Sequence, residues 1–280
     1  MSLSAQAVPV TFSLGSVLCW GTSDFLGGYA SRRANSILVT AITNCTGLLA
    51  IVPISWLSGS PTPALTNVAW ALAGGACGGS ALALFYRALA SGNMGSTAPV
   101  AAILAAAIPA LFGMLTQGVP GSLQIGGFIL ATLGIWLISR SDQDGPPQGL
   151  KLAFIAGVGF AGFYICAKQA GTGSALWLAA SSRLAALVAT ATWTLASKSF
   201  HPAERASLRL GAIAGVIDVA GSVFFFRALQ TGRMDATVVL SSLYPVVTVL
   251  LARIVLKEHF TRWKTAGILA ALAAVPLIAS

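Results

Sequence analysis

The chain of 280 residues is 56% hydrophobic and only 8% charged, and its mean hydropathy is +0.83. A soluble domain carries about 25% charged residues, so this chain has too few charges to cover a surface that faces water, and most of it must lie in lipid. The net charge of +9 does not indicate a nucleic-acid-binding protein, because the basic residues stand in short clusters between apolar runs and form no patch.

Ten apolar runs are long enough to cross a membrane, since a helical span needs about 20 mostly apolar residues. Each run is continuously apolar, whereas the strands of a membrane barrel alternate over about 10 residues, so the runs are predicted to be helices. No Lys or Arg precedes the first run, which favours a retained span over a cleaved signal peptide. In chain order the predicted spans are 9–29, 36–57, 67–90, 94–117, 121–139, 150–169, 174–197, 207–230, 234–255 and 263–279.

The longest polar segment between these spans, SRSDQDGPPQGLK at 139–151, lies at the midpoint of the chain. Its acidic residues, its proline pair and its glycines are typical of a linker. We therefore predict a first five-helix repeat over 1–140, a linker over 141–150 and a second five-helix repeat over 151–280.

The two halves repeat each other in sequence. LFYRALASGNM at 84–94 and FFFRALQTGRM at 224–234 stand 140 positions apart and share Phe, Arg, Ala, Leu, Gly and Met in step. Because each half has an odd number of spans, the second copy enters the membrane from the opposite face, as in the inverted repeats of many secondary transporters. The predicted fold class is an all-α integral membrane protein with ten transmembrane helices in two inverted five-helix repeats.

Basic residues are unequally shared between the loops on the two sides of the membrane. Counted with the span ends beside them, and leaving aside Arg87 and Arg183, the loops after spans 1, 5, 7 and 9 hold eleven Lys and Arg residues, those after spans 6 and 8 hold three, and those after spans 2 and 4 hold none. Cytoplasmic loops carry the excess of Lys and Arg in membrane proteins. We expect a multi-pass protein of the plasma membrane, in a bacterium the inner membrane, with both termini outside.

Three charged side chains lie in the interior of the apolar runs, away from the span ends, namely Asp24, Arg183 and Asp218. A charge inside the bilayer is costly and marks a functional site by default. Arg183 and Asp218 have two interpretations: an ion pair that joins spans 7 and 8, or a substrate pair. In the substrate pair Arg183 holds a carboxylate, and Asp218 meets an ammonium group or takes a proton. Asp24 is a further candidate, and its alternative is a side chain that reaches toward the interface.

Aromatic residues on the spans could stack against a planar apolar substrate, since ring contacts add about 0.5–1.5 kcal/mol beyond the buried area. The alternative for each residue is core packing or the aromatic belt at the interface. The candidates for substrate binding are Trp20, Tyr86, Phe163, Tyr164, Phe225 and Tyr244.

Glycine and proline suggest places where a span could bend. Gly78 and Gly79 leave a bare face on the third span, which suits either tight helix packing or a hinge. Pro245 removes a backbone donor from the ninth span and is predicted to kink it.

No motif for a nucleophile, a metal or a phosphate-binding loop is present, and the two histidines, His201 and His259, lie in loops. The sequence therefore predicts no enzyme, no catalytic residue, no cofactor and no metal site. The four cysteines lie within apolar runs without a CxxC pair, and we interpret them as small buried hydrophobes without a disulfide.

Several motifs resemble the drug/metabolite transporter superfamily, and specifically its ten-span EamA-type exporters. They are WG at 20–21, FYRAL at 85–89, FFRAL at 225–229 and YPVVTVLLARIVLKEHFTRWKTAGILA at 244–270. Ala105 departs from the pattern, since it stands where Pro245 falls in the second half. Within the superfamily the chain is most similar to the YddG-like aromatic amino acid exporters. The resemblance implies a basket of ten helices around a central cavity, lined by spans 1, 3, 4, 6, 8 and 9, with spans 5 and 10 at the periphery.

The function that these features favour is a secondary transporter that exports small amphipathic metabolites, such as aromatic or other apolar amino acids, by alternating access. Its partners would be the small-molecule substrate and membrane lipid, with protons as a coupling ion if Asp24 or Asp218 titrates in the cavity, and no nucleic acid. One alternative is an antiporter for nucleotide sugars or phosphorylated metabolites, which needs several basic residues on the lining spans. Another is a structural or signalling membrane protein without transport.

Overall fold

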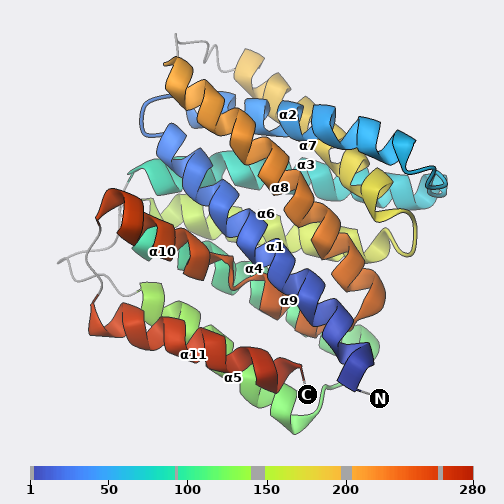
Figure 1. Ribbon diagram of the computed structural model, residues 1–280, viewed down its shortest axis with the longest axis vertical. Coiled ribbons are helices and arrows are strands. Elements are labelled where there is room, and N and C mark those ends of the chain that lie inside the picture. The colour runs from blue at the N-terminus through green and yellow to red at the C-terminus, as the bar shows by residue number, and fades with distance from the viewer. Residues whose placement is uncertain (1–2, 92–93, 140–148, 197–203, 258–260, 280) are drawn as a thin grey trace.

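A computed structural model describes residues 3–91, 94–139, 149–196, 204–257 and 261–279. These residues form eleven α-helices and no strand (Figure 1). The helices are α1 (Leu3–Ala30), α2 (Ser36–Leu57), α3 (Leu65–Ser91), α4 (Met94–Gln117), α5 (Ser122–Ser139), α6 (Leu150–Gln169), α7 (Ala175–Ala196), α8 (Arg205–Thr231), α9 (Met234–Ser241), α10 (Tyr244–Leu256) and α11 (Arg262–Ile278).

The predicted ninth span is interrupted, and this is why eleven helices stand where ten spans are predicted. α9 ends at Ser241, and α10 begins at Tyr244 with Pro245 in its first turn. Proline fits the first turn of a helix but cannot donate a hydrogen bond to the turn before it. The chain therefore starts a new helix here.

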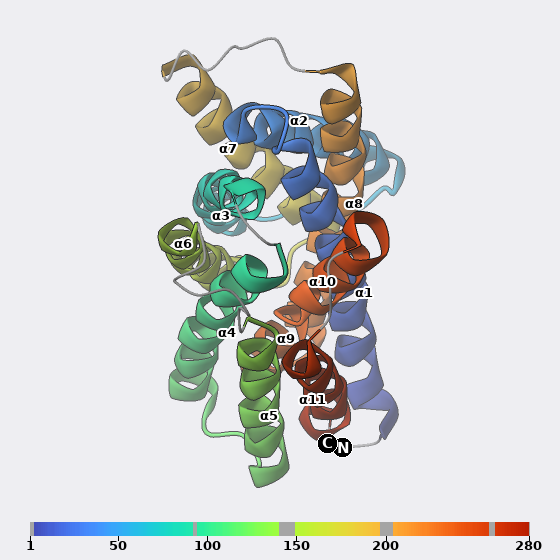
Figure 2. The same cartoon turned by 90° about the vertical axis from the view of Figure 1, so that its left-hand side faces the viewer.

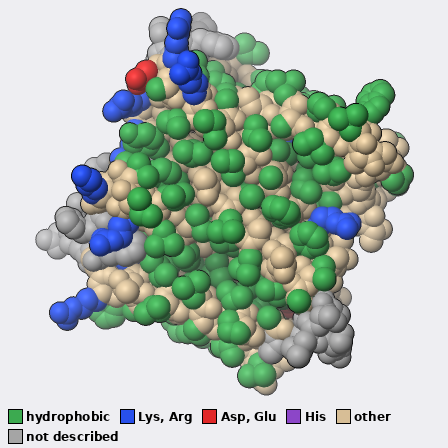
Figure 3. All heavy atoms as spheres, viewed as in Figure 1, with side chains coloured by type: hydrophobic (Ala, Val, Ile, Leu, Met, Phe, Trp, Pro, Cys, Tyr) green, Lys and Arg blue, Asp and Glu red, His purple; other side chains and the backbone are tan. Residues whose placement is uncertain are grey.

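The helices have the length and composition of membrane spans. Among the described residues, seven segments are long and apolar enough to cross a bilayer, with α9 and α10 counted together as Met234–Leu256, and Ser122–Ile138 is a shorter apolar helix. Their outward faces carry large apolar side chains, such as Trp56 and Leu115. Figure 3 shows hydrophobic side chains spread over the whole of one face, with the charged ones at its margins, and a surface of this kind suits lipid.

The packing follows the inverted repeat. α1 packs along α8, and α3 packs along α6. Since α6 and α8 of the second half correspond to α1 and α3 of the first half, these two contacts are equivalent under the repeat. α2 packs against α7, and α5 against α11, so each of these helices contacts its own counterpart. Because each half crosses an odd number of times, both termini lie at the same end of the molecule (Figures 1 and 2). The fold is thus an all-α bundle of two inverted five-span repeats.

The pair of α5 and α11 forms a separate layer at the edge of the bundle (Figure 1). Their backbones approach closely at two glycines: a Cβ on Gly267 would lie 2.6 Å from the carbonyl oxygen of Gly134. Small residues allow such contact between membrane helices. The peripheral position of both helices agrees with the expectation for spans 5 and 10.

Basic side chains gather at the end of the bundle opposite the two termini. In Figure 3 they line the left edge, where α1 ends and α8 begins in the same view. Most of the predicted linker over 141–150 lies outside the described residues. Only Gly149 and Leu150 are described, and α6 starts there.

Candidate functional site

A narrow cavity lies at mid-depth, between the middles of α1, α3, α6, α7 and α8 and the first residue of α10. Its volume is about 60 Å³, measured as the space open to the centre of a water molecule. A single water needs about 10–15 Å³ on this measure, so in this conformation the cavity holds a few waters, and an aromatic solute would fit only in a wider state. Its lining residues are Trp20, Asp24, Gly75, Gly78, Gly79, Leu82, Phe160, Phe163, Tyr164, Ser182, Arg183, Ala186, Asp218 and Tyr244.

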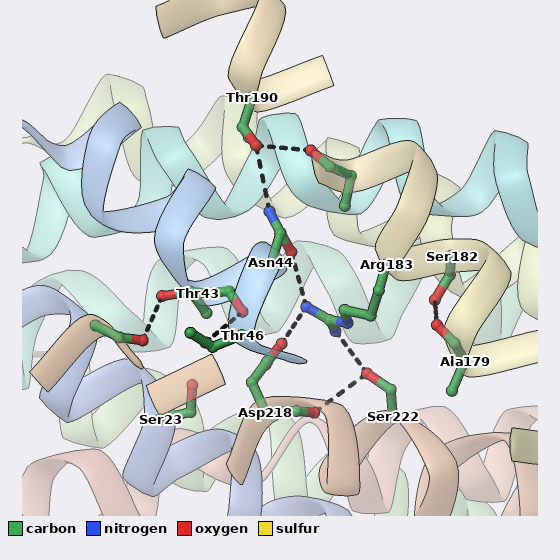
Figure 4. Close-up of polar contacts among 12 residues, drawn as sticks. Ser23, Thr43, Asn44, Thr46, Ala179, Ser182, Arg183, Thr190, Asp218 and Ser222 are labelled. Atoms are coloured by element: carbon green, nitrogen blue, oxygen red, sulfur yellow. Dashed lines mark hydrogen bonds and ion pairs between the residues drawn. The ribbon is translucent and has the colours of Figure 1, made fainter. Parts of the chain in front are cut away.

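Arg183 on α7 and Asp218 on α8 form an ion pair in the wall of this cavity (Figure 4). Both side chains are buried, Arg183 at 8% exposure and Asp218 at 4%. A buried ion pair is stable only with good geometry and further hydrogen bonds, and removal of one partner is strongly destabilising. The structure thus shows the pair that joins α7 to α8, and the same two residues face the cavity.

Two neutral side chains complete the shell around Arg183. Its Nη1 donates to the Asn44 side-chain oxygen at 3.0 Å, and its Nη2 donates to the Ser222 hydroxyl at 2.6 Å (Figure 4). The Nε of Arg183 is buried, and no hydrogen-bond partner for it exists among the described residues. Sequence reasoning missed Asn44 and Ser222. The available signals were a lone amide within the apolar run of span 2, and a serine one helical turn after Asp218.

Asp24 on α1 is the second carboxylate of the cavity, and its side chain faces inward rather than toward the interface. The residue is 5% exposed. Within the described part of the chain, no hydrogen bond or ion pair joins its carboxylate to another residue. Burial of a carboxylate without a partner is costly, and such a group in a membrane protein indicates a ligand or a proton site.

Aromatic rings also line the cavity. Trp20 stacks on Tyr164 with ring centroids 5.9 Å apart, and Phe163 stands edge-on to Trp20 at 6.3 Å. Phe225 packs on Tyr164 at 4.6 Å and on Trp20 at 5.1 Å. α1, α6 and α8 therefore bring four predicted aromatic residues into one cluster.

Tyr244 enters the cavity at the interruption between α9 and α10. Its hydroxyl is buried and has no hydrogen-bond partner among the described residues, while its ring stands edge-on to Phe85 at 6.1 Å. α1 can approach this point because residue 21 is glycine: a Cβ there would lie 2.5 Å from the carbonyl oxygen of Tyr244. Thr248 adds a 3.0 Å hydrogen bond to the carbonyl oxygen of Gly21.

Three predicted site residues do not line the cavity. Phe225 lies behind Trp20 and Tyr164 as core packing. Tyr86 is fully buried between α1 and α3, where its hydroxyl lies 3.4 Å from that of Ser23. Pro245 lies in the first turn of α10, directly after Tyr244.

Gly78 and Gly79 line the cavity within a helix that runs without interruption from Leu65 to Ser91. A Cβ on Gly79 would lie 2.6 Å from Cα of Ala186, and one on Gly78 would lie 3.3 Å from the side chain of Phe163. These glycines therefore allow α3 to pack closely on α6 and α7. A hinge at this place stays a prediction.

The set of lining helices differs from the one that the resemblance implies. α7 contributes Ser182, Arg183 and Ala186, whereas no described side chain of α4 reaches the cavity. α7 crosses α3 closely at the glycine face, and this brings its middle to the cavity. α5 and α11 contribute no lining residue in the described ranges.

Metal ligands are not grouped in the described part of the chain, where no three His, Cys, Asp or Glu side chains come together. Cys19, Cys45, Cys77 and Cys166 are free thiols. The polar chemistry of the cavity therefore comes from two carboxylates, one guanidinium, hydroxyl groups and the nearby amide of Asn44.

Known proteins resemble the chain at two levels. The model of the EamA-like transporter family matches it twice, over residues 8–140 and 147–280. A solved structure described only as "Crystal structure of protein" has a TM-score of 0.76, covers 98% of this chain and 97% of its own, and is 15% identical. At that identity the likeness concerns the fold alone. No curated protein matches the chain.

Proposed function

The chain belongs to the EamA-like transporter family, and on that premise we propose that it exports small amphipathic metabolites, above all aromatic and other apolar amino acids. The mode is secondary transport by alternating access, as expected for inverted repeats around a mid-membrane site. The two units that move against each other are residues 1–140 and residues 151–280.

One observation supports this substrate class above all: a carboxylate without a partner and a group of aromatic rings line the same cavity at mid-depth. Asp24 offers a site for an ammonium group, and Trp20, Phe163 and Tyr164 offer rings for an apolar side chain. The free Nε of Arg183 offers one donor to a carboxylate. An amino acid with an aromatic side chain carries all three complementary groups.

The cavity is less suited to nucleotide sugars or phosphorylated metabolites. Among its described lining residues Arg183 is the only cation, and Asp218 already neutralises it. A phosphate group needs several donors and positive charges, whereas here it would meet a second carboxylate, that of Asp24.

The basic end of the bundle is the cytoplasmic end in this proposal, because Lys and Arg accumulate on that side of membrane proteins. Both termini then lie outside a bacterial inner membrane. Protons are the candidate coupling ion, since two carboxylates line the cavity, and passive export down a gradient is the alternative.

Flux into proteoliposomes tests the substrate class. Purified protein is reconstituted, and uptake of labelled phenylalanine, tryptophan and threonine is compared with uptake of a nucleotide sugar and a sugar phosphate, with protein-free liposomes as the control. We expect saturable uptake of phenylalanine and tryptophan. Flux of a sugar phosphate without flux of any amino acid would sink the proposal, and no flux of either class would favour a structural protein.

A further inference from the structure

We propose that the cavity recognises its solute by charge at the ammonium group alone, with Asp24 as the counter-ion. Aromatic amines that lack a carboxylate then bind at least as tightly as the corresponding amino acids. This inference rests on the proposed transport function and names the chemical class that the site favours.

The charges in the cavity do not balance. Asp24, Arg183 and Asp218 are the ionisable acid and base side chains among the described lining residues. Arg183 and Asp218 neutralise each other in their ion pair. An ionised Asp24 then has no cation of the protein beside it among the described lining residues, and in a mostly apolar cavity, where dielectric screening is weak, it favours a cationic ligand.

The guanidinium of Arg183 has little capacity left for a ligand carboxylate. Its two terminal nitrogens are occupied by Asp218, Asn44 and Ser222. These contacts use three of its five N–H groups and leave Nε and one N–H of Nη2. The charge of the guanidinium is already matched by Asp218, so a ligand carboxylate would have to compete with Asp218 for the same cation.

The aromatic wall is placed to contact a cation held by Asp24. Trp20 and Asp24 are four residues apart on α1, which puts their side chains on the same face of the helix, and both line the cavity. An ammonium group within about 6 Å of an indole ring is attracted by its π-face. An aromatic amine can thus place its cation between Asp24 and Trp20 and its ring against Phe163 and Tyr164.

Three ligands with the same ring and a two-carbon spacer separate the contributions of charge. They are phenethylamine, phenylalanine and 3-phenylpropanoate, which are a cation, a zwitterion and an anion at neutral pH. Binding to the purified full chain in lipid nanodiscs is measured by calorimetry and does not depend on flux. We expect phenethylamine to bind at least as tightly as phenylalanine, and 3-phenylpropanoate to bind at least tenfold more weakly.

Two variants assign the charge to its residue. Asp24→Asn should weaken phenethylamine binding by about 10- to 100-fold, the loss of one charged hydrogen-bonded contact, with little effect on 3-phenylpropanoate. Asp24→Glu keeps the charge and should retain most of the amine affinity. Asp218→Asn is the matched control at the other carboxylate: it frees Arg183 and should strengthen binding of 3-phenylpropanoate.

The inference is overturned if phenylalanine binds and phenethylamine does not, or if Asp24→Asn leaves the amine affinity unchanged. Either result leaves amino acid transport intact. The wild-type comparison of the three ligands decides the matter even if Asp24→Asn does not fold. Amine binding that depends on Asp24 without flux of any labelled amine or amino acid in proteoliposomes would instead refute the proposed function.

Discussion

Arg233, the residue before α9, donates a hydrogen bond of 2.6 Å to the backbone carbonyl of Gly118, which lies between α4 and α5. The same guanidinium holds the fully buried carboxylate of Asp235. Gln117 closes the contact by accepting a 2.9 Å hydrogen bond from the backbone N–H of Met234. Gln117 and Gly118 belong to the first half, and Arg233 and Met234 to the second. These hydrogen bonds therefore join the two halves at the end of the bundle where the termini lie.

We predict that Arg233→Gln destabilises the protein, because it leaves the carboxylate of Asp235 buried without its cation. The expected loss is about 1–3 kcal/mol, read as a lower unfolding temperature in detergent. The hydrogen bond to Asp235 raises the pKa of Arg233 above its ordinary value, so the contact should persist at alkaline pH. Arg227→Gln is the control, since Arg227 is exposed at the same end. Equal effects of the two substitutions would contradict the prediction.

Asp218→Asn should lower transport without preventing membrane insertion. It leaves Arg183 buried with neutral partners only, and breaking such a pair costs about 3–5 kcal/mol. Flux in proteoliposomes and the yield of folded protein are the two measurements. Wild-type flux at every pH would show that Asp218 has no part in the site or in proton coupling.

The double variant Arg183→Met with Asp218→Leu separates the structural role of the pair from its functional role. Replacement of a buried ion pair by apolar residues of similar size is often neutral or stabilising. We therefore expect the double variant to unfold at or above the temperature of the single variant Asp218→Asn, and to remain defective in transport. Wild-type flux in the double variant would show that the ion pair has a structural role only.

Trp20→Ala should weaken the binding of aromatic solutes more than that of threonine, because it removes a ring that lines the cavity and stacks on Tyr164. The ring contact is worth about 0.5–1.5 kcal/mol, which corresponds to about a two- to tenfold rise in the KM for phenylalanine. Trp56→Ala is the control, since Trp56 is 77% exposed on the outer face. An equal rise in KM for threonine would argue against a role of Trp20 in selecting aromatic solutes.

Gly79→Ala should destabilise the crossing of α3 and α7. The new Cβ would meet the backbone of Ala186 at 2.6 Å, and overpacking of this kind costs about 1–3 kcal/mol. Gly126→Ala on α5 is the matched control, because its Cβ would meet nothing within 4 Å. The measurement is the unfolding temperature of both variants, and an unchanged value for Gly79→Ala would show that the contact yields easily.

Much of the fold can be predicted from the sequence, because lipid imposes long apolar runs and the turns between them carry Gly, Pro, Ser and Asn. The predicted span at 36–57 matches α2 at both ends. The interruption at Ser242–Leu243 was harder to predict. Pro245 indicates a kink, but the choice between a bent helix and two helices depends on the contacts of Tyr244 and Thr248 with α1.

The candidate site was predictable only in part. Charges within apolar runs pointed to Asp24, Arg183 and Asp218, and all three line the cavity. Asn44, the neutral partner of Arg183, was missed. The role of an amide side chain within a span cannot be predicted until the residues that it contacts are known. The rotation of each helix about its axis decides which side chains face inward, and that rotation depends on contacts between distant segments, such as Gly79 with Ala186.

The interrupted ninth span has a mechanical consequence. α9 is bonded at its first residue to the end of α4, through Met234 and Gln117, and at its last residue to α1, through Ser241 and Ser16, whereas α10 is bonded to α1 through Thr248 and Gly21. A tilt of α4 relative to α1 would therefore pull on the start of α9 while α10 stays on α1, and the two residues that join the segments would take up part of the motion. Tyr244 adjoins that joint and lines the cavity. A movement of the helices at the joint would therefore change the shape of the cavity directly.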